Sequence, residues 1–501
     1  MALNIFYEGY SSVNGYQSYI LNEIDKQVHF DGCVLTNQDC DGKDIYGEKY
    51  KCINYDICTN SRYELYYDMN DFLPLERDIL EQMQPYESMA MKLLVRITEY
   101  DIFNYDEAKR LYLQNLRFWN HVFTTEKINF AFFSGIPHHT HDYVIYCLCK
   151  VKNIPICIIT PTHMRNRWFV GTSLDTIGAN TLKEYRRLLE ANDEIVLPED
   201  LEKYYNDFIC RNKQTVSTVM DGLNKKAKIK SIVEINQGYV NNKKVFKRSL
   251  SRIKKGITST SGSQERKVAF ELLNKDFSYI KRTKKRIKGG KKPADYDKMA
   301  QNPVENEKYI LFLLHLQPEA TTLPQAEVFV EQDLPIRILA RAVEGKGIKI
   351  YVKEHYVQPW RDKSFYSDLA SIKNVVLIRS DVDSKSLVLN SVACSTCTGT
   401  VALEATANEI PVLLFSKGGF DDGPGMFYVS SVKECEEVLQ RILNNEVIIS
   451  KDEVRRYLQA FVNASVRHYS PHNKEISHEE LLDSQKQLVG VIVSRINGGM
   501  S

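Results

Sequence analysis

Apolar and polar positions along the first part of the chain fall into blocks that match strands and helices. Residues 3–10, 128–135 and 154–160 are short apolar runs that end at turn residues, which is typical of buried strands. Residues 70–125 and 141–153 instead carry apolar side chains at helical spacing. Strands that alternate with helices form parallel sheets, so this pattern predicts an α/β domain from the start of the chain.

A second alternating series begins at residue 308. Its apolar runs are separated by helical segments, which predicts a second doubly wound domain. Together the two series predict an α/β fold of two Rossmann-like doubly wound domains that face a cleft. The apolar runs of the second series lie at residues 308–321, 347–355, 374–380, 392–399 and 410–415.

Charged segments and chain breakers separate the two series. Between residues 182 and 304 the hydrophobicity falls, and Gly- and Ser-rich stretches alternate with Lys- and Arg-rich ones. We therefore expect a basic helical insertion or interdomain arm at 182–304. It separates an N-terminal domain at 1–181 from a C-terminal domain at 305–445, and we expect C-terminal helices at 446–501 to pack back across the domains.

The composition is that of an ordinary globular protein. The 501 residues are 43% hydrophobic and 26% charged, and a chain of this length normally needs more than one core. The opening MALNIFYEGYSS has neither a basic leader nor a long apolar stretch, and no run of about 18 apolar residues follows it. The 11 cysteines are irregularly spaced, which favours a reducing compartment. We therefore expect a cytoplasmic protein.

The net charge of +2 conceals one strongly basic segment. Residues 225–292 hold 22 of the 66 Lys and Arg residues but 4 of the 64 Asp and Glu residues, which leaves 44 basic and 60 acidic residues elsewhere. Such a segment either docks on an anionic membrane surface or forms a solvated helical face. It lacks the regular aromatic residues that would stack bases, so nucleic acid is not an expected partner. We favour peripheral docking on the inner face of the cell membrane.

Polar residues follow three strands of the second series. Ligands bind beyond the carboxyl ends of parallel strands, so these residues are candidates for a binding site. The stretch 395–400 places hydroxyl side chains and a glycine at the start of a helix, where N–H groups and the helix dipole suit a phosphate. A carboxylate one turn inside the same helix could accept ribose hydroxyls, whereas plain N-capping is the alternative for the Ser and Thr residues. The binding candidates are Gln317, His355, Ser395, Thr396, Thr398, Gly399 and Glu404.

A cluster of histidines follows the apolar run at 128–135. A histidine paired with a carboxylate can remove the proton of a hydroxyl group, so we expect a catalytic base in this loop. The alternative is that some of these residues cap the next helix or lie on the surface. The catalytic candidates are His138, His139, His141 and Asp142, with Glu8 and Glu319 as the next ones to consider.

Three segments of the second series resemble the signature segments of bacterial capsule polysaccharide biosynthesis glycosyltransferases, which include Kdo transferases. The segments are KYILFLLHLQPEATT, IYVKEH and STCTGTVALEATANEIPVLLF, and the similarity covers about residues 305–420. The resemblance implies the GT-B fold, with an acceptor-side domain at 1–181 and a nucleotide-sugar-binding domain at 305–445. It assigns the phosphate and ribose of a donor nucleotide to His355, Ser395, Thr396, Thr398, Gly399 and Glu404.

The chain departs from this family at two places. Tyr356 stands where the family usually has Pro, and the segment 160–167 lacks the acidic motif of the Kdo transferases. Arg165 and Arg167 lie in that segment instead and are candidate ligands for an anionic sugar or a phosphate.

The GT-B resemblance implies neither a metal nor another cofactor. GT-B enzymes generally stabilise the departing nucleotide with a helix dipole and side chains. Asp381 and Asp383 form a DxD pattern that binds metal in another glycosyltransferase fold, but here they lie between a strand and a helix, which favours capping. Cys394 and Cys397 form a CxxC pair without a second pair or a histidine cluster to complete a zinc site.

These observations favour a glycosyltransferase that moves a sugar from a nucleotide-activated donor, with CMP-Kdo the preferred one, to a lipid-linked saccharide acceptor. The product would be a bacterial surface polysaccharide or a glycolipid such as lipopolysaccharide. One alternative is a CDP-alcohol phosphotransferase of the teichoic-acid type. Another is a non-catalytic GT-B protein that acts as a scaffold or binds nucleic acid. The sequence predicts no particular oligomeric state.

Overall fold

A computed structural model describes most of the chain. Its described residues form two compact units, which are called here the first domain (within 2–174 and 466–499) and the second domain (within 175–209 and 292–465). The described residues are 2–9, 16–37, 49–61, 63–94, 105–164, 166–191, 195–209, 292–317, 319–355, 358, 361, 363–418, 423–469 and 476–499.

A seven-stranded sheet forms the centre of the first domain, in the order β13-β6-β5-β4-β1-β2-β3. The strands from β5 to β3 pair in parallel, whereas β6 is antiparallel to β5 and β13 is antiparallel to β6. The strands are β1 (Asn4–Glu8), β2 (Gly32–Asn37), β3 (Tyr50–Asn54), β4 (Phe130–Phe133), β5 (Ile156–Pro161), β6 (Arg167–Gly171) and β13 (Val466–Arg467).

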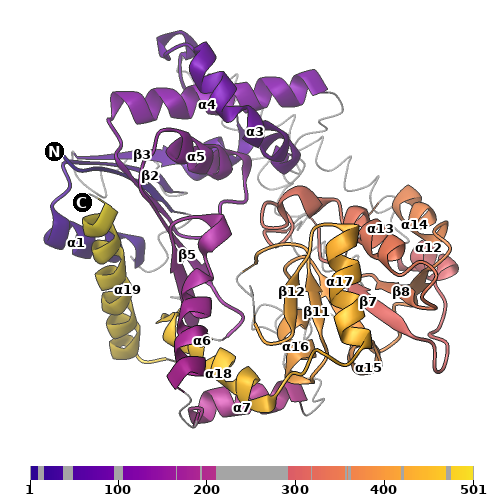
Figure 1. The fold of residues 1–501 in the computed structure, drawn as a ribbon. Helices are drawn as coiled ribbons and strands as arrows, with labels where there is room; N and C mark the ends of the chain where they lie inside the picture. Colours follow the sequence, from indigo (N-terminus) through magenta and orange to yellow (C-terminus); the bar gives the residue numbers. More distant parts are fainter. Residues whose placement is uncertain are drawn as a thin grey trace. The chain divides into compact units, whose positions relative to one another are not determined.

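Helices cover both faces of the first sheet (Figure 1). Successive side chains of a strand point to opposite faces. Ile5 and Tyr7 therefore pack with α1 and α19, whereas the ring of Phe6 meets that of Trp119 in α4 edge-on, with 5.5 Å between centroids. The helices are α1 (Tyr16–Val28), α2 (Tyr55–Asn60), α3 (Arg77–Leu93), α4 (Tyr105–Thr125), α5 (Thr140–Val151) and α19 (His478–Gly499), with 3₁₀ helices η2 (Tyr63–Leu65) and η3 (Met69–Asp71).

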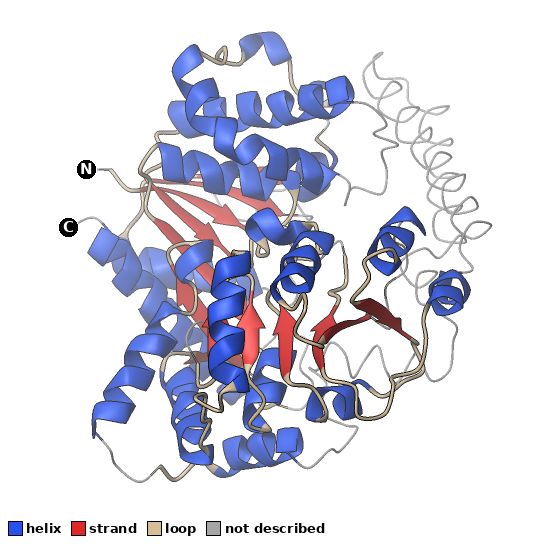
Figure 2. Cartoon of the chain, turned by 45° about the vertical axis from the view of Figure 1, so that its right-hand side comes forward, coloured by secondary structure: helices blue, strands red, loops and turns tan. Residues whose placement is uncertain are grey.

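The second domain contains a six-stranded sheet in the order β12-β11-β10-β7-β8-β9, and all of its described strand pairs are parallel (Figure 2). Its strands read as nearly continuous apolar runs because both faces are buried. The strands are β7 (Tyr309–Leu313), β8 (Lys349–Lys353), β9 (Val375–Ile378), β10 (Ala393–Thr396), β11 (Val412–Leu414) and β12 (Met426–Tyr428).

Helices pack around the second sheet and extend to the ends of the domain. Two of them, α17 and α18, begin with a capping box in which Ser431 or Ser450 bonds the glutamate three residues later. The helices are α6 (Ala179–Ala191), α7 (Glu199–Ile209), α12 (Lys292–Met299), α13 (Asp333–Ala342), α14 (Lys363–Ala370), α15 (Ser384–Leu389), α16 (Val401–Ala407), α17 (Val432–Leu443) and α18 (Lys451–Asn463), with 3₁₀ helices η5 (Leu174–Thr176) and η6 (Glu327–Val330).

The two Rossmann-like α/β domains confirm the fold class expected from the sequence. Helix α7 and most of α6 fall in the range 182–304 that was expected to form the basic insertion. Both helices belong to the second domain, where α6 packs on α18 and α7 packs on α16. The C-terminal helix α19 belongs to the first domain, where it packs on α1 and β5.

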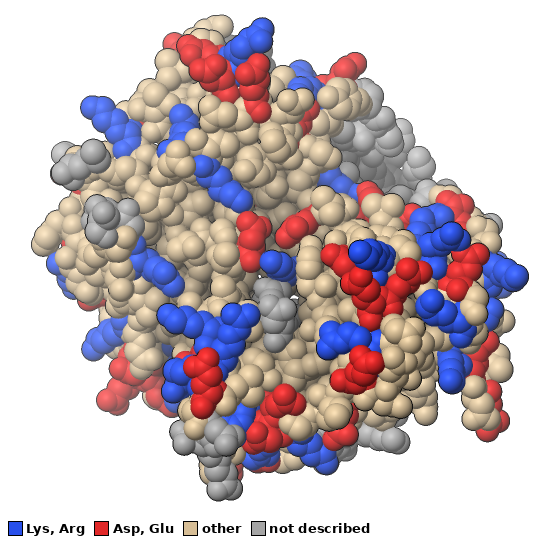
Figure 3. All heavy atoms as spheres, viewed as in Figure 1, with Lys and Arg blue, Asp and Glu red and all other residues tan. Residues whose placement is uncertain are grey.

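Most of the basic segment lies outside the described residues, since residues 210–291 are not among them. The expected insertion and its membrane docking therefore stay predictions. Among the described helices, none is long and apolar enough to cross a membrane. Figure 3 shows basic and acidic side chains interspersed over the described residues of the face in view.

Candidate functional site

In both sheets the first strand of the domain lies beside the fourth strand in chain order. In the first domain β1 pairs with β2 on one side and β4 on the other, and in the second β7 pairs with β8 and β10. The chain winds in opposite directions from such a pair, and open α/β sheets generally bind ligands beyond the carboxyl ends of the two strands. The residues after β1, β4, β7 and β10 are therefore the first to consider.

At the end of β1, the carboxylate of Glu8 lies beside the end of β4. Glu8 Oε2 accepts hydrogen bonds from the main-chain N–H of Ser134 at 3.0 Å and from its hydroxyl at 2.6 Å. Burial, and then the negative charge of Asp142, raise the pKa of Glu8 to about 7, although the bonds from Ser134 act against this shift. A carboxyl group at the switch point of the first domain thus titrates near neutral pH.

His139 and Asp142 are joined at the start of α5. Asp142 Oδ1 accepts the main-chain N–H of His139 at 2.7 Å, and Asp142 Oδ2 lies 3.5 Å from His139 Nδ1. The hydroxyl of Tyr55 lies 3.2 Å from the same ring nitrogen. Burial alone would raise the pKa of Asp142, but the bond with His139 and the nearby histidines hold it at about 2. Asp142 is therefore an anion that orients His139.

The other two histidines of this loop have different surroundings. His138 is half-buried, and its Nδ1 makes a short contact with the carbonyl oxygen of Ile136. His141 is fully buried, and neither ring nitrogen has a hydrogen-bond partner among the described residues. Burial lowers the pKa of His141 to about 3, so its ring is neutral. The structure thus brings all four predicted catalytic residues of the loop together, but it leaves His141 without access to solvent.

The two arginines predicted as anion ligands lie elsewhere or outside the described residues. Arg165 is outside them. Arg167 begins β6, which is separated from β4 by β5 in the sheet, and its main chain bonds Thr162 and Met164. Arg167 therefore belongs to a different part of the sheet edge from the histidine loop.

In the second domain, His315 occupies the switch point between β7 and β10. Its Nε2 lies 2.8 Å from the hydroxyl of Thr396 and accepts the main-chain N–H groups of Cys397 and Thr398 at 3.3 Å each. Burial lowers the pKa of His315 to about 4, so the ring is neutral and its Nε2 is an acceptor. The glycine that follows needs its small size, because a Cβ on Gly399 would lie 2.6 Å from Thr396 Oγ1 and 3.2 Å from His315 Cε1.

These contacts change the expected roles of the 395–400 stretch. The N–H groups of Cys397 and Thr398, which the sequence suggested for a phosphate, are bonded to His315. Ser395 is fully buried, and its hydroxyl donates to the carbonyl of Leu413 in the neighbouring strand. The reason is that β10 extends to Thr396, so Ser395 is a strand residue inside the sheet. We therefore do not retain Ser395 as a phosphate ligand.

Thr398 and Glu404 take different places after β10. The hydroxyl of Thr398 donates to the carbonyl of Thr321 at 2.7 Å, which ties the loop after β10 to the loop after β7. Glu404 lies on α16, where burial raises its pKa and its charge acts on Tyr204 of α7. Thr398 thus fixes loop geometry, and Glu404 is turned toward the helix packed on α16.

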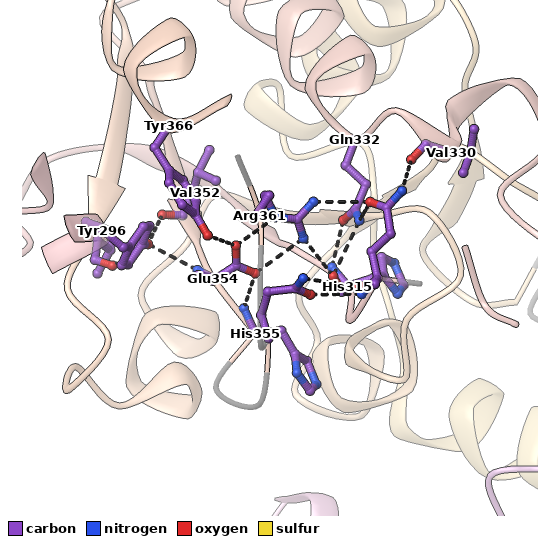
Figure 4. Close-up of polar contacts among 12 residues, drawn as sticks. Tyr296, His315, Val330, Gln332, Val352, Glu354, His355, Arg361 and Tyr366 are labelled. Atoms are coloured by element: carbon purple, nitrogen blue, oxygen red, sulfur yellow. Dashed lines mark hydrogen bonds and ion pairs between the residues drawn. The ribbon is translucent and has the colours of Figure 1, made fainter. Parts of the chain in front are cut away.

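A buried ion pair organises the loops after β7 and β8 (Figure 4). Arg361 Nε donates to Glu354 Oε2 at 2.8 Å, and the side chains of these two residues are 8% and 9% exposed. Arg361 also donates to the carbonyl of His315 at 2.9 Å and to Gln317 Oε1 at 3.2 Å. The hydroxyl of Tyr366 donates to Glu354 Oε2 at 2.5 Å. The guanidinium therefore fixes the end of β7 against the end of β8.

The side chain of Gln317 is part of this hydrogen-bond network. Its amide donates to the carbonyl of Val330 at 3.3 Å, and its carbonyl oxygen accepts from Gln332 at 3.1 Å. The main chain of Gln317 exchanges two bonds with the side chain of Gln358. Gln317 is consequently a positioning residue for the loop after β7.

His355 and Glu319 lie at the edge of the network. The main-chain N–H of His355 donates to Glu354, and Figure 4 shows its ring apart from the bonds drawn around Arg361. Burial lowers the pKa of His355, while the carboxylates of Glu354 and Glu319 act in the opposite direction. Glu319 Oε2 accepts the N–H and the hydroxyl of Thr321, at 3.0 and 2.5 Å. The carboxylate of Glu319 is therefore near enough to His355 for its charge to act on the imidazole.

Only part of this arrangement could be predicted from the sequence. His315 lies inside the apolar run 308–321, where a single histidine followed by leucine gave no indication of an acceptor for loop amides. Glu354 and Arg361 are seven residues apart, and no spacing rule for helices or strands pairs them. The DxD pattern is explained as expected, because Asp383 caps α15 by accepting the N–H of Ser386 at 3.0 Å, and Asp381 pairs with Arg379.

Comparisons with known proteins give a likeness of fold. No protein-family model matches the chain, and no curated protein matches it. Among solved structures, KpsC of Thermosulfurimonas dismutans, a beta Kdo 2,7 transferase, is 10% identical, with 74% of this chain and 88% of that one covered and a TM-score of 0.30. The S. aureus MnaA–UDP structure is 10% identical, with 99% and 97% covered and a TM-score of 0.27.

The crystal structure of TarM is 14% identical, with a TM-score of 0.25, and the match covers 38% of this chain and 36% of TarM. The chain thus spans about a third of TarM. At these identities the likenesses concern the fold alone, and at these TM-scores no residue or activity is carried over from them.

Proposed function

We propose that this protein is a glycosyltransferase that uses a nucleotide-activated sugar. The observation that carries the proposal is the second-domain switch point, where the loops after β7, β8 and β10 are held together by His315, Arg361 and Thr398. Doubly wound sheets bind nucleotides in this crevice. A site that is ordered before the ligand arrives loses less conformational entropy on binding.

His355 is the proposed donor contact at this site. It follows β8 directly, its ring lies apart from the Arg361 network, and it is coupled to Glu319. A neutral imidazole can donate one hydrogen bond to a phosphate and becomes a stronger ligand when the phosphate raises its pKa. Thr396 and Gly399 would shape the same crevice through their contacts with His315.

The resemblance of residues 305–420 to capsule glycosyltransferases favours a CMP-activated anionic sugar such as CMP-Kdo as donor. It also favours a lipid-linked saccharide as acceptor and a bacterial surface polysaccharide or glycolipid as product. These finer assignments are proposals about substrate class. Arg165, which lies outside the described residues, stays a predicted ligand for an anionic sugar or a phosphate, and we propose no part for Arg167.

A proton acceptor for the acceptor hydroxyl is proposed in the first domain. His139 is the best-placed member of its loop, because its side chain is 26% exposed and Asp142 Oδ2 lies 3.5 Å from its Nδ1. Asp142 would hold the imidazole and stabilise its protonated form. His141 is buried and is not proposed as a base, and Glu8 is the next candidate because its pKa of about 7 is near neutrality.

The test is a thermal-shift screen of the purified chain with CMP, CDP, UDP and GDP. A ligand that binds only the folded protein stabilises it by about 2.7 kcal/mol at 100 times its dissociation constant. We expect CMP to stabilise the protein most. A hydrogen bond to a charged group contributes roughly 1.5 to 3 kcal/mol, so His355→Ala should weaken nucleotide binding by about tenfold to a hundredfold. Arg341→Ala, an exposed change on α13, is the control.

Two results would count against the proposal. If none of the four nucleotides stabilised the protein, the proposed donor site would be wrong. If His355→Ala left nucleotide affinity unchanged, the nucleotide would have to bind away from the end of β8. Product analysis separates sugar transfer from transfer of a phosphoalcohol.

A further inference from the structure

The loop between β4 and α5 brings together three side chains that can bind a metal ion. One ligand atom from each of His138, His139 and Asp142 lies within 4.8 Å of the other two. Zinc bonds of about 2.0 to 2.2 Å place neighbouring ligand atoms roughly 3 to 4 Å apart. The separation of 3.5 Å between His139 Nδ1 and Asp142 Oδ2 already lies in that range. Small changes in side-chain torsions would bring the third atom to the same distance.

His138 is held in the tautomer that a metal ligand requires. Its Nδ1 contacts the carbonyl oxygen of Ile136, which is an acceptor and therefore requires a proton on Nδ1. The lone pair of the neutral ring is then on Nε2. Metal-binding histidines commonly donate their second ring N–H to a main-chain carbonyl in this manner, which fixes the orientation of the ring.

Asp142 is held in a comparable way. Its Oδ1 accepts the main-chain N–H of His139 at 2.7 Å, which leaves Oδ2 for a ligand. The side chain is anchored at the start of α5 and is 3% exposed, so its orientation is fixed by the helix.

A fourth ligand would come from solvent. His138 and His139 are both half-buried, so an ion has access from solvent. The hydroxyl of Tyr55 lies 3.2 Å from His139 Nδ1, where it can bond a water molecule or another ligand of the ion. Three protein ligands and one open position are the arrangement found in catalytic zinc sites.

We propose that His138, His139 and Asp142 bind a divalent transition-metal ion, with zinc as the preferred one. Two imidazoles and one carboxylate suit zinc better than magnesium or calcium, which prefer oxygen ligands. Ion binding is a property of the first domain and does not depend on the proposed sugar transfer. The GT-B resemblance implies that no metal ion stabilises the departing nucleotide. A zinc ion bound by His138, His139 and Asp142 would not have that role.

The consequence for the reaction does rest on the proposed function. In the metal-loaded protein His139 is a ligand, and an acceptor hydroxyl at the open position would lose its proton more readily because the ion stabilises the alkoxide. The three residues would then position the acceptor, and a neighbouring carboxylate such as Glu8 would take the proton.

The experiment is isothermal titration of the purified, metal-free full chain with zinc chloride. We expect one zinc ion to bind per chain. Loss of a residue that only hydrogen-bonds a metal ligand already weakens metal binding by about tenfold or more. His138→Ala and Asp142→Asn remove ligands themselves, so each should weaken zinc binding by more than about tenfold. Asp142→Asn is chosen because the amide oxygen can still accept the N–H of His139 and keep the start of α5 intact.

His478→Ala is the matched control, since it removes an exposed histidine from α19 and leaves the loop untouched. Each variant is checked by thermal unfolding without metal, and His138→Ala decides the result if Asp142→Asn does not fold. The proposal is overturned if the parent chain binds no stoichiometric zinc, or if His138→Ala binds zinc as tightly as the control. Nucleotide binding is measured in parallel, so that failure of the zinc site and failure of the donor site can be told apart.

Discussion

Gly399 lies in the loop after β10, beside Thr396 and His315. An added methyl group would meet Thr396 Oγ1 at 2.6 Å and His315 Cε1 at 3.2 Å, so the loop would have to shift. We expect Gly399→Ala to lower the free energy of unfolding by about 1 to 3 kcal/mol. Gly490→Ala, where nothing lies within 4 Å on an exposed face of α19, should instead be neutral or stabilising by up to about 1 kcal/mol.

Chemical denaturation of the two variants checks this prediction. Equal stability of Gly399→Ala and the parent would show that the loop relaxes without loss, and the contact with His315 would then not constrain it. A matching loss of nucleotide binding in Gly399→Ala would connect the loop to the donor site.

His315 should make the stability of the second domain depend on pH. Its pKa is about 4 in the folded protein and 6.5 ordinarily. Above pH 6.5 both states are neutral and the full stability is present. Between pH 6.5 and 4 only the unfolded chain takes up the proton, so up to about 3 kcal/mol is lost as the pH falls.

Denaturation at a series of pH values, with His315→Gln beside the parent, isolates this residue. The variant should be less stable at neutral pH by about 1 to 3 kcal/mol, because two buried N–H groups lose their acceptor. Its decline between pH 6.5 and 4 should be shallower. An equally steep decline in the variant would assign the effect to other groups.

At the residue scale, clusters of residues that are neighbours in the sequence were more predictable than contacts between distant segments. The loop 138–142 is a local cluster, and the chain itself holds its members together. The bonds of His315 to residues 396–398 join segments about 80 positions apart, which no local pattern can report. The burial of Ser395 could not be predicted either, since one residue more in β10 moves a side chain from the crevice into the sheet.

The loop between β8 and α14 depends on the ion pair of Glu354 and Arg361. Breaking a buried pair leaves an uncompensated charge, so we expect Arg361→Met to destabilise the protein by about 3 to 5 kcal/mol. It should also loosen the end of β7, because the guanidinium bonds the carbonyl of His315. Nucleotide affinity should therefore fall in parallel.

Arg341→Ala serves as the control for this change. Arg341 pairs with Glu344, but their side chains are 70% and 64% exposed. An exposed pair contributes about 0 to 1 kcal/mol, so unfolding should hardly change. If Arg361→Met behaved like Arg341→Ala, the ion pair would not be what holds the loop.

At the scale of elements, buried parallel strands were the most predictable feature. The apolar runs at 308–321, 347–355 and 374–380 contain β7, β8 and β9, because a strand covered on both faces needs apolar side chains throughout. Strands β3 and β6 have half-exposed residues and give no such run. These two strands were not predicted for this reason, and the buried strand β2 was not predicted either.

The basic segment 225–292 provides a prediction for the whole molecule. Each Lys or Arg near an anionic leaflet contributes about 1 kcal/mol, so four of the 22 would give roughly 4 kcal/mol. We expect the chain to co-sediment with vesicles in proportion to their anionic lipid content. Binding should weaken as salt shortens the Debye length from about 10 Å at 0.1 M to about 3 Å at 1 M.

The control neutralises the cluster between Lys281 and Lys292 and leaves the rest of the chain unchanged. Loss of vesicle binding in this variant is the expected result. Binding that ignores salt and lipid charge, or that persists in the variant, would leave a solvated helical face as the explanation for this segment.

Helix α19 has a consequence for how the protein is made. Leu488, Val489, Ile492 and Ile496 fill the same core as β1 and α1, although they follow the second domain in the chain and are therefore synthesised after it. During translation this face of the first sheet is therefore covered by α1 but not by α19 while the second domain is being synthesised. The second domain can fold as it emerges, whereas the domain that begins first is completed last, and a nascent chain that stalls before residue 488 presents an apolar face to chaperones.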